Sequence, residues 1–126
     1  MKARSGHIKF DKKVKYSDLL PIYREIFERF LAETDQIPDL EPELTEVLLE
    51  QNFMDLRNNR KPEGYNRSGS MRMIFPISDE VEFYFYGRGK NTDVPRITEL
   101  VSRMLKKEGL KHRVEWDRML LYQRKK

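Results

Sequence analysis

The sequence predicts an α+β fold, a two-layer sandwich in which helices cover one face of a mainly antiparallel sheet. Two observations lead to this class. Apolar residues recur every three to four positions in residues 19–31, 40–48 and 94–105, a spacing typical of amphipathic helices. In residues 71–86 they alternate instead, which indicates an antiparallel hairpin. The expected order along the chain is β-α-α-β-β-α-β.

The first half of the chain is expected to hold one strand and two helices. A short strand in HIKF precedes a helix that Ser17 would cap, with Pro21 in its first turn, where the missing N–H is tolerated. The second helix, residues 40–52, has Pro42 in its first turn. It is acidic, because residues 36–56 contain six acids and no Lys or Arg.

The second half is expected to hold the hairpin, a third helix and a last strand. Asp93 would cap the third helix, and Gly109 would end it. A last strand or a bent hairpin should lie in KHRVEWDRMLLYQRKK, residues 111–126. Apolar side chains of the hairpin that should face the helices are Met71, Met73, Phe75, Ile77, Val81, Phe83 and Phe85.

Composition fits one domain, residues 1–126, with a flexible basic tail at 123–126. Hydrophobic residues make up 38% and charged residues 37%, and 25 Lys and Arg against 21 Asp and Glu give a net charge of +4. There is no cysteine, which excludes disulfides and thiolate chemistry. No apolar run is long enough for a signal peptide or a membrane span, so a soluble, cytoplasmic protein is expected.

A basic loop, residues 57–72, is predicted between the second helix and the hairpin. The stretch RNNRKPEGYNRSGSMRM places five cations against the single acid Glu63. Guanidinium groups bind phosphate oxygens in a planar, bidentate way, and the loop's glycines let a backbone approach a ligand closely. The loop therefore predicts a site for an anion.

The aromatic side chains near this loop extend the prediction to a ligand that carries a base as well as phosphate. Tyrosines on the outer side of the hairpin would stack on the base, and the turn after it adds further donors. The predicted ligand-binding residues are Arg57, Arg60, Lys61, Tyr65, Arg67, Ser68, Arg72, Tyr84, Tyr86, Arg88, Lys90 and Asn91.

Catalytic and cofactor motifs are missing from the sequence. It has no Walker loop, no GxGxxG after a strand, no HExxH and no GxSxG. His7 and His112 are far apart and are expected to be surface histidines on strands. No catalytic residue, metal or cofactor is therefore predicted.

Three ligand classes fit these residues. The first is a nucleotide, including a signalling nucleotide, since the size and the helices-plus-sheet build are similar to those of phage-type sequestering proteins. The second is single-stranded nucleic acid. The third follows from MRMIFPISDEVEFYFYGRGK, residues 71–90, whose place after two helices resembles RelE-type toxins. That resemblance implies metal-independent cleavage of RNA by Arg, Lys, His, Tyr and Glu.

Charge separation along the chain gives a further alternative, a non-enzymatic homo-oligomer. The last 24 residues carry nine cations and three acids. The acidic helix 40–52 of one copy could then meet the basic C-terminus of another.

Overall fold

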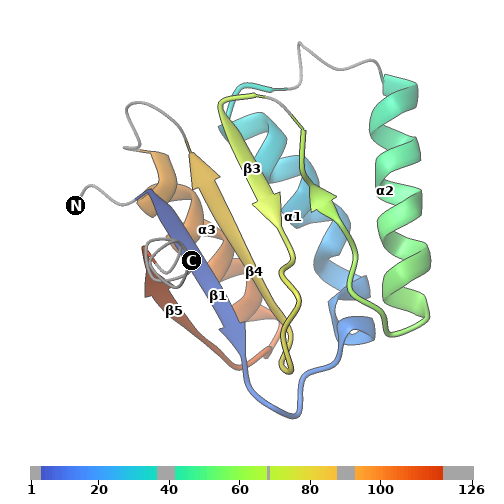
Figure 1. Ribbon diagram of the computed structural model, residues 1–126, viewed down its shortest axis with the longest axis vertical. Helices are drawn as coiled ribbons and strands as arrows, with labels where there is room; N and C mark the ends of the chain where they lie inside the picture. The colour runs from blue at the N-terminus through green and yellow to red at the C-terminus, as the bar shows by residue number, and fades with distance from the viewer. Residues whose placement is uncertain (1–3, 37–41, 68, 88–92, 118–126) are drawn as a thin grey trace.

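A computed structural model describes residues 4–36, 42–67, 69–87 and 93–117 (Figure 1). These residues form an α+β fold, which confirms the predicted class. In chain order the elements are β1 (Ser5–Phe10), the 3₁₀ turn η1 (Tyr16–Leu19), α1 (Leu20–Glu33), α2 (Pro42–Arg57), β2 (Gly64–Tyr65), β3 (Met71–Ile74), β4 (Glu82–Gly87), α3 (Asp93–Lys107) and β5 (His112–Trp116).

The sheet has the strand order β2-β3-β4-β1-β5, and each neighbouring pair is antiparallel. It follows that β1 and β3 run parallel and are connected through α1, while β4 and β5 run parallel and are connected through α3. This is the split β-α-β arrangement of ferredoxin-like folds, with α2 and β2 added to the first connection. The sequence predicted all these elements except β2 and η1.

Helices α1 and α3 lie behind the sheet in Figure 1, and α2 lies beyond its β2 edge. Aromatic rings fill the space between the layers: Phe30 of α1 stacks on Phe85 at 5.5 Å between ring centroids. Helix α3 packs directly on β1, because a Cβ added to Gly6 would lie 2.1 Å from Oγ1 of Thr98. Glycine at this position is what allows the close approach.

The start of α1 differs from the prediction. Ser17 is not its N-cap but lies within η1, and the first helical turn follows directly from Leu19. The carboxylate of Asp18 instead accepts a hydrogen bond from the backbone N–H of Lys15 at 2.8 Å. The 3₁₀ turn places backbone groups ahead of α1, so no side chain has to cap it. Pro21 does lie in the first turn, as predicted.

The hairpin confirms the predicted alternation at six of its seven inward positions, and Ile77 is the exception. Strand β3 ends at Ile74, and the side chain of Ile77 is 95% exposed. Pro76 explains the difference, since proline has no N–H to continue the ladder. The other six inward residues, Met71, Met73, Phe75, Val81, Phe83 and Phe85, are buried.

Helix α3 follows the predicted apolar pattern. Val94, Ile97, Val101 and Leu105 are buried, and the chain turns after the helix at Gly109, whose φ is +77°. Strand β5 is shorter than the predicted strand, since it ends at Trp116. Residues 118–126 of that prediction, which include the basic tail 123–126, lie outside the described residues.

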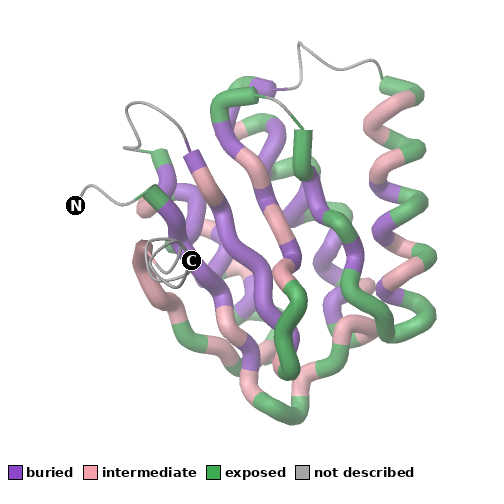
Figure 2. The backbone as a smooth tube through the Cα atoms, viewed as in Figure 1, coloured by how far each residue is buried: buried purple, intermediate pink, exposed green. Residues whose placement is uncertain are grey.

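The two central strands are buried on both of their faces, as Figure 2 shows for β1 and β4. The helices account for only one of those faces. Polar residues occupy much of the other, which makes that face the first place to look for a site.

Candidate functional site

The face of the sheet turned away from α1 and α3 carries the largest group of polar side chains on neighbouring strands; we call it the outer face. The strand register arranges these side chains in rows that run across the sheet. The first row is Arg72, Tyr86 and Ser5; the second is Ile74, Tyr84, His7 and Glu115; the third is Glu82, Lys9 and Arg113.

Three of these residues form a buried polar cluster on the two central strands. Ser5 and His7 are fully buried, and Glu82 is 2% exposed. The hydroxyl Oγ of Ser5 lies 2.9 Å from Nε2 of His7, within hydrogen-bond distance. On the other side of the ring, Nδ1 of His7 lies 3.6 Å from Oε2 of Glu82. Tyr84 stacks on the imidazole, with 4.8 Å between the ring centroids.

Two atoms of the cluster lack a hydrogen bond. Neither Nδ1 of His7 nor Oε2 of Glu82 has a hydrogen-bond partner among the described residues, because 3.6 Å is too long for a bond between them. A buried polar group without a partner costs about 1–3 kcal/mol of stability. Native proteins keep few such groups, and one reason to keep them is a ligand that supplies the missing partner.

The residues around the cluster are more accessible and carry cations. Lys9, Arg72 and Tyr86 are half-buried, and Arg113 is exposed. The guanidinium of Arg72 donates to Oδ1 of Asn66 at 3.1 Å and forms no ion pair with a described acid. Arg113 donates to Oε2 of Glu115 at 2.9 Å. The outer face therefore combines cations, tyrosines and a buried polar pair.

The predicted basic loop, residues 57–72, is only partly irregular, because its two ends belong to α2 and β3. Arg57 belongs to α2 and pairs with Glu50 at 3.1 Å, and Arg60 lies 3.3 Å from Asp55. Both arginines are thus neutralised in part by acids of α2 itself. In Figure 1, α2 runs down to its end at Arg57, whereas β3, which carries Arg72, begins near the upper end of α2. Within the intervening chain, Gly64–Tyr65 forms the short strand β2.

The remaining predicted residues divide into three groups. Tyr84 and Tyr86 face outward on β4, as the alternation predicted. Tyr65 faces inward: it is 3% exposed and packs against Phe27 and Phe30, so its ring is not placed to stack on a base. Lys61 and Arg67 are exposed, with no ion pair to a described acid. Ser68, Arg88, Lys90 and Asn91 lie outside the described residues.

The acidic helix has partners within its own chain. Glu46 accepts a hydrogen bond from Arg24 of α1 at 3.0 Å, and this bond lowers the pKa of the Glu46 carboxyl. Glu50 pairs with Arg57. The predicted oligomer contact between residues 40–52 and the C-terminus stays a prediction, since residues 118–126 lie outside the described part.

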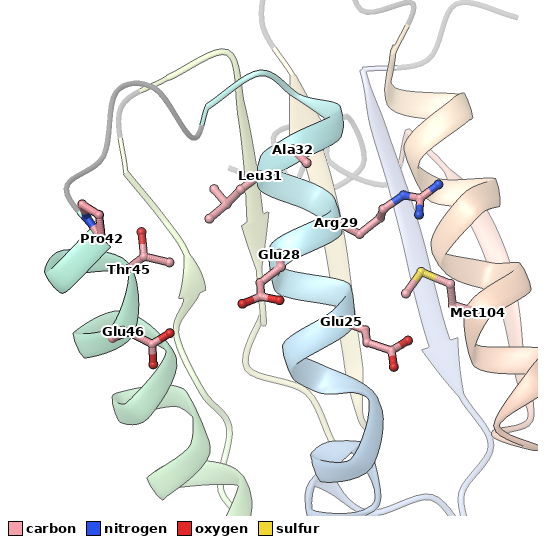
Figure 3. Close-up of a pocket in the computed structure, with 9 residues that line it drawn as sticks. All are labelled: Glu25, Glu28, Arg29, Leu31, Ala32, Pro42, Thr45, Glu46 and Met104. Carbon is pink, nitrogen blue, oxygen red and sulfur yellow. The ribbon is translucent and has the colours of Figure 1, made fainter.

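A second candidate lies in the helix layer. A cavity of about 650 Å³ opens between α1, the start of α2 and Met104 of α3 (Figure 3). Its lining includes the three acids Glu25, Glu28 and Glu46 and one arginine, Arg29. Carboxylates repel phosphate, so this cavity is unsuited to the anion that the sequence predicts.

Sequence reasoning missed the polar cluster. It placed His7 on a strand surface, whereas the imidazole is fully buried. One signal was present: in SGHIKF, Ser5, His7 and Lys9 alternate with Gly6, Ile8 and Phe10, so one side of the strand is polar. That alternation does not reveal that Glu82 lies beside His7, because their pairing joins residues distant in the sequence.

Comparisons of the chain with protein-family models, with curated proteins and with solved structures give no match. Within the described residues, no group of three His, Cys, Asp or Glu side chains is placed to hold a metal ion. In the same part of the chain, no helix combines the length and the apolar character needed to cross a membrane. Function therefore has to be argued from the chemistry of the outer face.

Proposed function

We propose that this protein binds single-stranded nucleic acid on the outer face of its sheet. The observation that carries the proposal is the first row, in which Arg72 and Tyr86 are direct cross-strand neighbours. A guanidinium beside a half-buried tyrosine ring offers one phosphate contact and one stacking surface. Side chains on an antiparallel sheet are also how several RNA-binding modules present aromatic rings to unpaired bases.

The spread of the cations favours an extended ligand. Arg72 stands on β3 and Arg113 on β5, and the order β3-β4-β1-β5 puts three strand spacings between them. At ~4.8 Å per spacing, the two strands are about 14 Å apart. Arg72 and Arg113 also stand two rows apart along the strands, a further ~14 Å, so the two positions are about 20 Å apart. Lys9 stands next to Arg113 in the third row. Contacts this far apart fit successive phosphates of a strand better than the phosphates of one nucleotide.

A free nucleotide is the second candidate, and the same first row favours it. Arg72 and Tyr86 by themselves supply what one phosphate and one base require. The two candidates differ in their dependence on length: a nucleotide site saturates with mononucleotides, whereas a strand site gains affinity as an oligonucleotide grows. Release of a discrete nucleotide from heat-denatured protein, identified by mass spectrometry, would favour the second candidate.

The test is fluorescence anisotropy with labelled oligodeoxythymidylates of 3, 6 and 11 nucleotides at several salt concentrations. We expect affinity to rise with length and to fall with salt. Arg72→Gln should reduce the slope of log K against log salt by about 0.7, the value for one phosphate contact on a single strand. Tyr86→Leu should weaken binding about tenfold at every salt concentration, because it removes a stacking surface.

Arg103→Gln is the matched control, since Arg103 is an exposed arginine on α3, on the opposite side of the sheet. It should bind like the wild type. If Arg103→Gln and Arg72→Gln weaken binding equally, the attraction is a general effect of net charge and the outer face is not the site. If no oligonucleotide binds at low salt, the proposed function is wrong.

A further inference from the structure

The unpaired atoms of His7 and Glu82 lie within the proposed site. In the third row, Glu82 stands opposite Lys9, and Lys9 stands opposite Arg113. Tyr84, which stacks on His7, is the cross-strand neighbour of that histidine. A strand that crosses the outer face would thus pass over the polar pair, between the tyrosines and the cations.

The Ser5 hydroxyl can donate to Nε2 of His7 or accept from it, and the first arrangement suits a ligand. When the Ser5 hydroxyl donates to Nε2 across 2.9 Å, the neutral ring carries its proton on Nδ1, beside the carboxylate of Glu82. The site then offers one N–H donor and one carboxylate acceptor, 3.6 Å apart and both without a hydrogen-bond partner among the described residues. Such a pair matches a ligand edge on which an acceptor and a donor stand side by side.

We infer that His7 and Glu82 read the Watson–Crick edge of a guanine in the bound strand, an inference that rests on the proposed function. Guanine presents O6 next to two N–H donors, N1–H and the N2 amino group. Nδ1–H of His7 donates to O6, and the carboxylate of Glu82 accepts from N1–H and from the amino group. A carboxylate gains two hydrogen bonds only from guanine, since the other bases present a single donor beside their acceptor.

Access to the pair requires a movement of Tyr84. His7 and Glu82 are nearly fully buried, and the ring of Tyr84 lies against the imidazole. Guanine reaches the pair when Tyr84 turns away from His7, and the displaced ring then stacks on a base of the strand. Tyr84 thus exchanges its contact with His7 for a contact with a base. The guanine supplies hydrogen-bond partners for Nδ1 of His7 and Oε2 of Glu82.

The experiment compares undecamers of thymidylate whose central base is dG, deoxyinosine or dA. Inosine keeps O6 and N1–H but lacks the amino group, so it isolates the second contact of Glu82. We expect wild-type protein to bind the dG strand about tenfold more tightly than the dA strand, with inosine between them. Glu82→Gln and His7→Phe should bring the three affinities together.

Glu80→Gln serves as the control, because Glu80 precedes β4 in the hairpin turn and lies outside the cluster. It should keep the preference for dG. Ser5→Ala tests positioning: it should reduce the preference partly, because Nε2 of His7 loses the hydroxyl that donates to it. Thermal unfolding of each variant shows whether it is folded.

Three outcomes are decisive. A preference for dG that Glu82→Gln abolishes supports the inference. Equal binding of the three strands by wild-type protein overturns the inference and leaves the proposed function standing. Binding of none of them overturns the proposed function as well.

Discussion

Two buried polar clusters in this protein differ in how completely they are hydrogen-bonded. Asn52 of α2 joins the helix layer to the edge of the sheet: its Oδ1 accepts from the Tyr23 hydroxyl at 2.6 Å and from the Gly64 N–H at 2.9 Å. Its Nδ2 donates to the carbonyl of Leu48 at 2.7 Å. On the outer face, by contrast, His7 and Glu82 each keep one atom that has no hydrogen-bond partner among the described residues.

We interpret the Asn52 network as structural and the His7–Glu82 pair as part of the proposed site. A buried network in which each group has a partner stabilises one arrangement of the chain, and Asn52 holds β2 in place through Gly64. Gly64 itself has φ +81°, and a Cβ there would lie 2.3 Å from the carbonyl oxygen of Met73. A buried pair whose atoms lack hydrogen bonds lowers stability, and a ligand that supplies those bonds is the role we propose for His7 and Glu82. The following predictions test this division.

Removal of the hydrogen-bonded network around Asn52 should have the largest effect on stability. Asn52→Ala leaves the Tyr23 hydroxyl and the Gly64 N–H buried without partners, and should lower the free energy of unfolding by about 3 kcal/mol. Urea unfolding measures it. Asn58→Ala is the control, because Asn58 is exposed just after the end of α2 and its side chain donates to the carbonyl of Met54. A loss at Asn52 as small as at Asn58 would contradict a structural role for the network.

The same network should weaken at alkaline pH. Burial raises the pKa of Tyr23 well above its ordinary value. The folded state therefore holds this proton at pH values where the unfolded chain releases it, so the contribution is full below pH ~10 and declines above it. In that range, the free energy of unfolding of wild-type protein should fall with pH more steeply than that of Tyr23→Phe, by about 1.4 kcal/mol per pH unit. Chemical unfolding of both proteins between pH 9 and 11 measures this difference. If the two plots of unfolding free energy against pH are parallel, the Tyr23 proton does not contribute in this way.

Much of the fold was predictable because local patterns determine it. The spacing of Ile22, Ile26 and Phe30 predicts α1, and the alternation of Phe83 and Phe85 predicts β4; in both cases the buried side of one element is read from its own residues. The two-residue strand β2 was missed because its pairing depends on Gly64 and Asn52, which meet only in the folded chain. Ile77 was misplaced because the apolar pattern continues past the proline that ends β3.

The candidate site was less predictable, since it depends on contacts between distant residues. Tyr86 and Arg72 were predicted because both lie on the strands of a hairpin that is recognisable in the sequence. Ser5, His7 and Glu82 were not, because β1 and β4 are paired across about half of the chain. Charge also misled: Arg57 and Arg60 appear free in the sequence, but the helix brings Glu50 and Asp55 to them.

Replacement of the Glu82 carboxylate should change the free energy of unfolding less than Asn52→Ala does, and in the opposite direction. Glu82→Gln puts a neutral amide where a buried carboxylate has an unpaired oxygen, so we expect stability to rise by about 1 kcal/mol while the preference for guanine is lost. Urea unfolding compares it with Glu80→Gln, which should match the wild type. A loss of about 3 kcal/mol or more would identify His7 and Glu82 as a stabilising ion pair and remove the contrast with Asn52.

The exposed ion pair between Glu33 and Arg96 should have the smallest effect on stability. Glu33 of α1 accepts a hydrogen bond from Arg96 of α3, which lowers the pKa of the Glu33 carboxyl, and the charge of Arg29 lowers it further. A lowered pKa means that the contribution is present at neutral pH and is lost as the pH falls through the folded-state value. Solvent screening keeps it small. Glu33→Gln should therefore reduce the Tm by less than about 2 °C at pH 7 and should not change it at pH 3. Glu99→Gln, at an exposed position of α3, should leave the Tm unchanged at both pH values. A larger loss at Glu33 than at Asn52 would mean that exposed ion pairs, rather than the buried network, hold the helix layer together.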